Sequence, residues 1–403
     1  MAMQGLYRLG DKQFSANDSD VQSILKTAHK VKSRPVCLCN TPHPEMYVAQ
    51  VGRDYILKRM PGTGHTHAPS CHTFDPPPEV SGLGHVTGKA IVDGEDGETL
   101  LKLGFSLSIR DGKAPPAPGS GEGTRTASLP ATKLSLLGLL HYLWDEAELT
   151  KWRPAMRDKR NWWIVRRELL AAAAHKNTRS TELGKILYIP ESFQIDRKDQ
   201  IEATRRSFMH SLLPVKEKPQ PLGLMIGEYK GRSDTSYGQK LQIKHAPDFP
   251  FLMDRSLVDR FEKIIGDYVL DLETYPKSHL MLIATFTAKE HRADIREIAG
   301  MLVSDQWLPY EHDREFRLIN AMLDRSFTKC MRYNLGRGAA IASALLLDCE
   351  TPTALYTTTE DMNEDETASL EEIASDGKFP YWIWKFEETE VPALPIRASK
   401  QKD

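Results

Sequence analysis

The sequence predicts an α+β protein of several domains, with a β-rich zinc-binding module at the N-terminus, a winged-helix-like middle and an α/β domain at the C-terminus. Two observations predict a globular protein of several domains, and the spacing of apolar residues, described below, predicts its mixture of helices and strands. The chain has 403 residues, which exceeds one ordinary core and predicts about two to four domains. Hydrophobic residues make up 40% of the chain and charged residues 27%, values that are typical of globular proteins and argue against wholesale disorder.

Two segments with the composition of linkers divide the chain. Residues 111–130 are rich in proline, glycine and serine and have little to bury, which predicts a flexible linker. Residues 214–221 contain three prolines, which disfavour both helix and strand pairing. The expected units are a zinc-binding β-rich module at 1–110, the linker at 111–130, a winged-helix-like helical domain at 131–213, an α+β domain at 222–305 and a final domain at 306–403.

The spacing of apolar residues predicts the individual elements. In the N-terminal module, strands are expected at 46–51, 55–58 and 100–109. A helix at 134–147 follows the linker, and a further apolar pattern covers 162–175. The next unit is expected to contain strands at 222–229, 241–244 and 280–286 and helices at 256–267 and 293–302. In the last unit, a helix at 314–324 precedes strands at 330–333, 342–347 and 354–358.

Three of the five cysteines fall between positions 37 and 71. In a reducing compartment such clustering points to a metal rather than to disulfides. Structural zinc takes four ligands in a tetrahedron, commonly two from each of two short turns. Cys37 and Cys39 form one such pair, and His67 and Cys71 form the other. We therefore predict that these four residues hold one structural zinc ion per chain.

His65 and His72 compete with His67 for the fourth position. Three intervening residues let His67 and Cys71 converge, whereas His72 directly follows Cys71 and is expected to point away. A catalytic zinc would need an open coordination position and a nearby acid or base, which a site with three thiolates disfavours. The alternative to a metal site is a group of unpaired buried cysteines and surface histidines.

The segment from 151 to 210 is basic, with 14 lysines and arginines against 7 acidic residues, although the net charge of the chain is −2. This asymmetry predicts a basic face. A leucine-rich helix followed by basic residues and tryptophans resembles a winged-helix unit with a phosphate-contacting helix. The alternative is a solvated helix face, and Trp162 and Trp163 are expected to pack rather than to stack on bases. The residues expected to contact nucleic acid are Arg153, Lys159, Arg160, Arg166, Arg167, Lys176 and Arg179.

The last domain resembles restriction-endonuclease-like PD-(D/E)XK folds in the order of its elements. In that family two carboxylates hold Mg²⁺ and a lysine helps to orient the attacking water. Here the strand expected to begin with Pro-Asp contains Ala344, and the strand expected to carry Glu-x-Lys contains Tyr356. These side chains cannot replace carboxylates, so the resemblance implies a degenerate nuclease-like domain. The alternative is a rearranged Mg²⁺ site around Glu315, Asp348 and Glu350.

Further motifs extend over nearly the whole chain. They are Cys37-Leu38-Cys39, residues 58–64 with His67 and Cys71, residues 136–144, Ile226-Gly227-Glu228, Ile243-Lys244-His245, residues 247–250 and Trp307-Leu308-Pro309. In these motifs the chain resembles an uncharacterised bacterial family that is defined only as a domain of unknown function and is carried by plasmids and integrative conjugative elements. The resemblance implies a mobile-element setting and the handling of nucleic acid, and it brings no established activity.

We therefore expect a non-catalytic nucleic-acid-binding protein of a bacterial mobile genetic element, with DNA favoured over RNA as its partner. The alternatives are a Mg²⁺-dependent DNA endonuclease and a protein-interaction subunit of a larger nucleoprotein complex. No stretch approaches the roughly 20 apolar residues of a membrane span, and the first dozen residues lack the apolar core of a signal peptide. A cytoplasmic protein without a membrane partner is expected.

Overall fold

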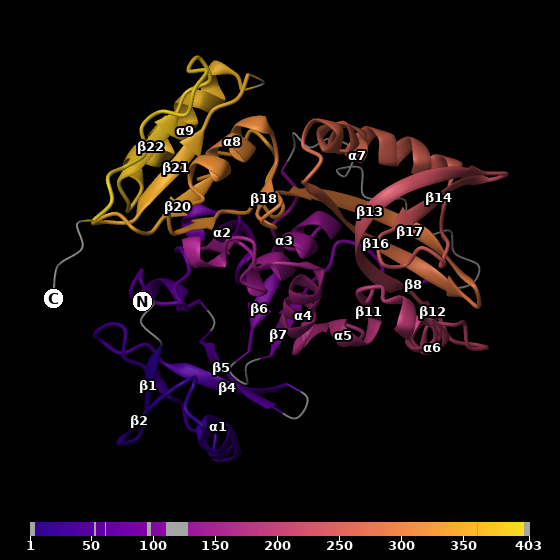
Figure 1. Ribbon diagram of the computed structural model, residues 1–403, viewed down its shortest axis with the longest axis horizontal. Coiled ribbons are helices and arrows are strands. Elements are labelled where there is room, and N and C mark those ends of the chain that lie inside the picture. The colour runs from indigo at the N-terminus through magenta and orange to yellow at the C-terminus, as the bar shows by residue number, and fades with distance from the viewer. Residues whose placement is uncertain are drawn as a thin grey trace.

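The computed structural model describes residues 5–51, 54–60, 62–94, 98–109, 128–360 and 362–398, and every structural statement below refers to these residues. The structure is mixed α/β, as the sequence predicts. A closed five-stranded barrel lies at one side, a five-stranded C-terminal sheet lies at the other, and small sheets of N-terminal residues lie below them in the view of Figure 1.

Two small sheets and one helix form the N-terminal part. Strand β1 (Leu6–Leu9) pairs antiparallel with both β2 (Lys12–Ser15) and β3 (Val36–Cys37), and β4 (Met46–Val51) forms a hairpin with β5 (Asp54–Arg59). The strands predicted at 46–51 and 55–58 are therefore confirmed. Helix α1 (Val21–Lys30) packs against this hairpin with its apolar face, which contains Ile24, Leu25 and Ala28.

A third small sheet connects the N-terminal part with the middle of the chain. It consists of β6 (Ile91–Asp93), β7 (Thr99–Leu101) and β10 (Lys176–Thr178), and β10 runs parallel to β7. The short helices η2 (Pro78–Val80) and α2 (Leu83–Val86) precede it. Helix α3 (Leu136–Glu146) confirms the prediction for 134–147 and is apolar on most sides, which explains its deep burial. Ser135 caps this helix by accepting a hydrogen bond from Gly138 N at 2.8 Å.

The middle of the chain gives one short strand to each of three sheets. Strand β9 (Lys151–Trp152) pairs with β19 (Phe327–Lys329) of the C-terminal sheet, β10 pairs with β7, and β11 (Leu187–Tyr188) pairs with the barrel strand β13 (Gly223–Thr235). The helices between them are η3 (Pro154–Met156), α4 (Trp162–Ala173), α5 (Leu183–Ile186), η4 (Ile195–Arg197) and α6 (Lys198–Ser211). The winged-helix-like arrangement is not confirmed, because these strands belong to three different sheets.

Five strands close the barrel. Strands β13, β14 (Gly238–Ile243), β15 (Phe251–Asp254), β17 (Arg292–Val303) and β16 (His279–Lys289) are hydrogen-bonded in this order, and β16 pairs again with β13. Residues 223–228 of β13 pair with β16, whereas its second half pairs with β14. Near this change of partner, a Cβ on Gly227 would lie 2.6 Å from Cγ2 of Ile243. A glycine is therefore needed for the strands to approach.

Helix α7 (Arg255–Thr274) connects β15 to β16 and confirms the helix predicted at 256–267. The helix predicted at 293–302 is wrong, because these residues form strand β17. The first half of β17 alternates between buried and more exposed residues, but its second half is buried on both faces, since α3 and α7 pack against it. A strand covered on both faces loses its alternation and is easily read as a helix.

The C-terminal sheet contains β9, β19, β20 (Ala344–Leu346), β21 (Thr353–Thr357) and β22 (Tyr381–Trp384) as neighbours in this order. All pairs are antiparallel except β21 with β22, which are joined by helix α9 (Glu364–Asp376). Helix α8 (Asp313–Ala321) precedes β19, and β18 (Pro309–Tyr310) extends the barrel sheet. The strands predicted at 342–347 and 354–358 are confirmed, whereas the one predicted at 330–333 is wrong because the strand ends at Lys329.

The predicted linkers have different outcomes. Residues 111–127 of the first lie outside the described residues. In the second, β12 (Gln220–Pro221) pairs antiparallel with β8 (Ser108–Ile109), so the expectation that this segment avoids strand pairing is wrong. One apolar core continues from Tyr7 of the N-terminal part to Tyr356 of the C-terminal sheet.

Among the helices of the described residues, none combines the length and the apolarity that a membrane crossing requires.

Candidate metal centre and the charged cavity beside it

Four potential metal ligands converge from two turns of the N-terminal part. Cys37 ends β3 and Cys39 follows two residues later, while His67 and Cys71 flank the turn after the short helix η1 (Gly64–Thr66). The Sγ atoms of Cys37 and Cys71 lie 3.8 Å apart, and His67 Nδ1 lies 3.4 Å from Cys39 Sγ and 3.9 Å from Cys71 Sγ. All four ligand atoms lie within 4.8 Å of one another. The four residues are close enough to bind one metal ion.

Backbone hydrogen bonds hold both turns in place. Cys37 pairs with Tyr7 of β1, and its N–H donates to Pro44 O at 2.8 Å. In the second turn, Cys71 N donates to Ala68 O at 2.8 Å. The carbonyl of Gly64 accepts from His67 N at 3.3 Å and from Asp75 N at 3.2 Å. The ligand positions are therefore fixed by the backbone rather than by side-chain contacts alone.

The ligand cluster lies in a water-poor environment, since His67 is 1% exposed and Cys37 is fully buried. Cys37 and Cys71 share a hydrogen bond, which raises the pKa of Cys37 and lowers the pKa of Cys71. Around them, Ala68 N donates to Cys39 Sγ at 3.4 Å. The hydroxyl of Thr73 lies 3.0 Å from Cys71 Sγ and 2.9 Å from His67 Nδ1. Such donors stabilise thiolates and orient ligands.

The two competing histidines lie outside the cluster. His65 is exposed on η1 and lines a neighbouring cavity. His72 is also exposed, and its Nε2 lies 3.1 Å from the hydroxyl of Tyr7. Within the described residues, His67 is the histidine whose ring nitrogen faces the three sulfur atoms.

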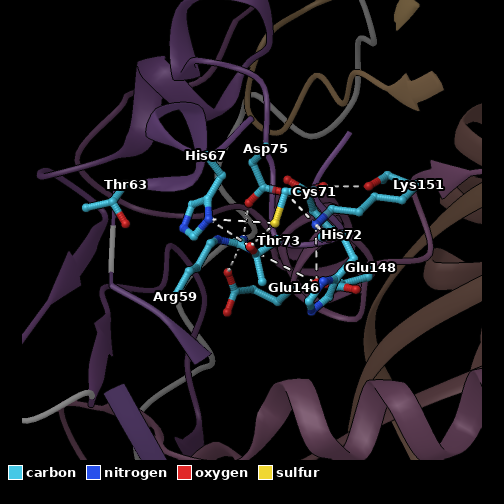
Figure 2. Close-up of polar contacts among 12 residues, drawn as sticks. Arg59, Thr63, His67, Cys71, His72, Thr73, Asp75, Glu146, Glu148 and Lys151 are labelled. Carbon is cyan, nitrogen blue, oxygen red and sulfur yellow. Dashed lines mark hydrogen bonds and ion pairs between the residues drawn. The ribbon is translucent and has the colours of Figure 1, made fainter. Parts of the chain in front are cut away.

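A polar cavity of about 310 Å³ lies beside the ligand cluster, between the N-terminal part and helix α3 (Figure 2). Its central side chain is Arg59, which forms a close ion pair with Asp75 and lies 3.7 Å from Glu146 and 3.8 Å from Glu148. Lys151 bridges two of these acids, at 2.9 Å from Asp75 and 3.2 Å from Glu148. These ion pairs join the metal-ligand turn to the end of α3.

Lys176 also lines the cavity and joins the same network of ion pairs. Its Nζ lies 2.7 Å from Glu146 and donates to Thr99 Oγ1 at 3.2 Å. Burial alone would raise the pKa of Glu146, but the positive charges of Lys176 and Arg59 outweigh burial and lower this pKa to about 2. The carboxylate is therefore ionised at neutral pH, and its charge is compensated. The arrangement is suited to holding two parts of the chain together.

The predicted nucleic-acid-binding residues fall into an exposed group and a group with structural contacts. Lys159, Arg167 and Arg179 are exposed, and Arg167 lies over the exposed ring of Trp163. The other four have structural contacts: Arg153 donates to Ser70 O, Arg166 to Ile189 O and Arg160 to Leu149 O, and Lys176 is the buried partner of Glu146. Trp162 is buried, as predicted, whereas Trp163 is 57% exposed.

The alternative Mg²⁺ site does not assemble in the described residues. Glu315 is buried and pairs with Lys329 at 3.0 Å, while Asp348 pairs with Arg325 at 2.8 Å and Glu350 is exposed elsewhere. The only described group of three or more potential metal ligands is the one around Cys37. Ala344 of β20 and Tyr356 of β21, where carboxylates would be expected, are both buried. Beside them, the hydroxyl oxygens of Ser343, directly before β20, and Thr357 of β21 lie 3.0 Å apart.

Sequence reasoning missed the charged cavity. Arg59, Asp75 and Glu146 come from three distant segments, and their meeting depends on the pairing of β10 with β7 and on the place of α3. One signal was available, because Glu146 ends an apolar helix and Glu148 follows it. The ten residues before Glu146 contain no acid except Asp145. Acids at the end of a buried helix require a cationic partner nearby.

Comparisons with known proteins place the chain at the level of a family. No curated protein and no solved structure matches it. The family model described as "Protein of unknown function (DUF1173)" matches residues 7–387. Because this match spans nearly the whole chain, including the Cys/His cluster and the cavity beside it, the chain belongs to the DUF1173 family of proteins of unknown function.

Proposed function

We propose that this protein is a non-catalytic nucleic-acid-binding protein of a bacterial mobile genetic element, acting on DNA in the cytoplasm. The observation that carries the proposal is the topology of the barrel. Its strands lie in the spatial order β13, β14, β15, β17 and β16, with β16 pairing again with β13, and helix α7 lies between β15 and β16 in the chain. The OB-fold is a five-stranded Greek-key barrel that binds oligonucleotides and oligosaccharides across its second and third strands. The corresponding strands here are β14 and β15.

The outer face of β14 and β15 offers groups suited to a nucleic-acid strand. Lys240 is paired with Leu252 in the ladder, and both are half-buried on the outer face, as is Gln242. Tyr237, in the turn between β13 and β14, is 86% exposed. Single strands are bound by cationic groups that follow the backbone and by aromatic rings on which bases stack. Lys240 and Tyr237 supply one group of each kind.

A second basic surface supports the same proposal. Lys159, which precedes α4, and Arg167, which lies on α4 over the Trp163 ring, are exposed and therefore available to phosphate groups. Arg160, which the sequence places in the same set, is a structural residue in this proposal, because its guanidinium donates to backbone carbonyl groups. Phosphate contacts of this kind position a protein on DNA without specifying a sequence.

In this proposal the Cys/His cluster holds a structural zinc ion. A tetrahedral zinc with bonds of about 2.3 Å to sulfur places two sulfur atoms about 3.8 Å apart, which agrees with the 3.8 Å between Cys37 and Cys71. Three cysteines and one histidine fill all four positions, which is typical of a closed structural site. The ion would keep the two turns together and would stabilise the N-terminal part.

The C-terminal sheet supports a non-catalytic protein over an endonuclease. Its order of one helix, three strands, one helix and one strand agrees with the expected nuclease-like scaffold. Ser343, directly before β20, and Thr357 of β21 are hydrogen-bonded to each other through their hydroxyl groups. Neutral hydroxyl groups do not provide the carboxylate ligands that Mg²⁺ requires. A scaffold of this kind would serve DNA binding or assembly with other subunits.

The proposal is tested by fluorescence anisotropy with a labelled 20-nucleotide single strand and with the matching duplex, at several salt concentrations. We expect binding at low salt that weakens steeply as salt rises, because counterions are released from phosphate groups. The absence of binding to either oligonucleotide at low salt would contradict the proposal.

A pair of matched variants assigns the binding to the barrel. The double variant Lys240→Glu/Tyr237→Ala should weaken single-strand binding about tenfold or more, since stacking and phosphate contacts each contribute about 1 to 3 kcal/mol. The control is Lys378→Glu/Tyr381→Ala, which changes an exposed lysine and an exposed tyrosine of the C-terminal part in the same way. Equal losses in both variants would place the binding surface elsewhere.

A further inference from the structure

A second cavity, of about 110 Å³, lies where the barrel meets helix α3 and the loop of residues 332–337. Its walls come from four distant parts of the chain, and most of them are apolar. The apolar side chains include Leu137 of α3, Ile264 of α7 and Ile298 and Met301 of β17. Concave apolar sites with a few convergent polar groups are the usual form of small-ligand sites.

His141 provides one polar group of this cavity. The side chain is 4% exposed, and its Nδ1 accepts a hydrogen bond from Tyr333 N at 3.0 Å. A neutral imidazole that accepts at Nδ1 carries its proton on Nε2. Burial lowers the pKa of His141 to about 4, so the ring is neutral at pH 7. Nε2–H is therefore a donor on the wall of the cavity, and no described residue accepts its hydrogen bond.

Among the described residues, the charged groups that line this cavity leave one positive charge without a partner. Glu311 accepts from Arg332 Nε at 2.7 Å, and Arg332 also donates to Ala339 O at 2.8 Å, so both are occupied. Arg337 lies in the same loop and lines the cavity, but no hydrogen bond or ion pair joins it to any described residue. An unpaired guanidinium beside an apolar wall favours an anionic ligand.

We propose that this cavity is a binding site for a small organic carboxylate. The apolar body of the ligand lies against Ile264, Ile298 and Met301, and its carboxylate faces the guanidinium of Arg337 and Nε2–H of His141, two residues that also line the cavity. The planar fork of an arginine matches the two oxygens of a carboxylate. A phosphate is disfavoured, since its higher charge is costly to desolvate against walls that are mostly apolar.

The cavity is tested with benzoate as the probe, using ligand-observed NMR and thermal unfolding of the full chain. Benzamide, which has a similar shape without the charge, and inorganic phosphate, which has charge without the apolar body, serve as comparisons. We expect saturable binding of benzoate and binding of benzamide at least tenfold weaker. The proposal is overturned if benzoate does not bind saturably, if benzamide binds equally well, or if phosphate binds as tightly as benzoate.

Two variants locate the site. Arg337→Gln should weaken benzoate binding about tenfold or more, because the charge-assisted hydrogen bonds between the guanidinium and the carboxylate are lost. Ala299→Leu fills the cavity without removing a charge and should abolish binding. Arg179→Gln changes an exposed arginine outside the cavity and should leave binding unchanged. Unchanged affinity in Arg337→Gln or in Ala299→Leu would overturn the proposal, and if either variant fails to fold the other decides.

Discussion

Glu315 Oε1 and Lys329 Nζ form an ion pair at 3.0 Å in which each side chain is only 4% exposed. The pair links helix α8 to strand β19, and Lys329 Nζ also donates to Cys330 O at 2.8 Å. Glu315 Oε2 accepts from Glu311 N at 3.0 Å. Both charges are thus removed from water and are satisfied by protein groups, which is the condition for a buried pair to be tolerated.

Removing one partner of this pair should destabilise the protein strongly. Lys329→Met leaves the Glu315 carboxylate buried without its cation, and we expect a loss of about 3 to 5 kcal/mol in the free energy of unfolding. Urea unfolding measures this value. The double variant Glu315→Leu/Lys329→Met should recover most of the loss. A single variant as stable as the wild-type protein would mean that water reaches the site.

Metal analysis tests the ligand set. The purified protein should contain about one zinc per chain. His67→Ala should lower this content and the melting temperature, because His67 Nδ1 lies 3.4 Å from Cys39 Sγ inside the cluster. His65→Ala is the matched control, since His65 is exposed outside the cluster, and it should retain the metal. Loss of zinc in His65→Ala but not in His67→Ala would show that the other histidine is the ligand.

His141 should make the stability of the protein depend on pH between 6.5 and 4. Burial lowers its pKa from 6.5 to about 4. In this window the unfolded state binds more protons than the folded state, so the stabilisation is complete above pH 6.5 and is lost as the pH falls. The full loss is about 3 kcal/mol.

The comparison with His141→Gln isolates this contribution, because a glutamine can still accept from Tyr333 N. Burial raises the pKa of Asp145 to about 6, so its contribution to stability grows as the pH falls. Because Asp145 is present in both proteins, this contribution cancels in the comparison. Urea unfolding at several pH values should show that the stability advantage of the wild-type protein shrinks as the pH falls from 7 to 4. A constant difference would mean that His141 is accessible to water.

Arg160 should behave as a structural residue rather than as a phosphate contact. It donates to Leu149 O at 2.8 Å and to Lys151 O, and it lies over the Trp152 ring at 5.7 Å. A lysine cannot reproduce several diverging hydrogen bonds. We expect Arg160→Lys to lower the free energy of unfolding by about 1 to 3 kcal/mol. DNA affinity of the folded variant should stay unchanged, whereas Lys159→Glu/Arg167→Glu should weaken it.

The protein should not cleave DNA. Incubation of plasmid with the purified chain and Mg²⁺ or Mn²⁺ should give no nicked or linear product, because no described carboxylate cluster is available for the metal. Asp348→Ala is the control for the rearranged site. Cleavage by the wild-type protein that this variant loses would instead support the endonuclease alternative.

The Cys/His cluster was predictable because its chemistry is local. Cys37 and Cys39 are two residues apart, His67 and Cys71 are four apart, and few other roles bring such residues together. Hairpin β4–β5 and helix α3 were predictable for a similar reason, since their spacing patterns lie within one short segment. These elements needed no knowledge of distant contacts.

Elements that depend on distant partners were not predictable. Strand β17 looks helical in sequence because α3 and α7 cover it from outside the barrel. Strands β9 and β11 have only two residues each, which is too short for a spacing pattern. They are strands only because they pair with β19 and β13. The Arg59 network likewise depends on the meeting of three segments. Apart from the acids at the end of the apolar helix, its charged residues look like ordinary surface residues in the sequence.

The middle of the chain gives one strand to each of three sheets, and this affects how the protein folds during synthesis. During synthesis, β7 cannot pair with β10 until some 75 further residues have been made. Likewise, β9 cannot pair with β19 until about 175 further residues have been made. Sheet edges stay open during these intervals, and open edges are sites of aggregation. Fragments cut at the boundaries that composition suggests would keep such open edges permanently. Residues 151–188 connect three sheets, and we therefore expect fragments that separate these residues from their partner strands to fold poorly.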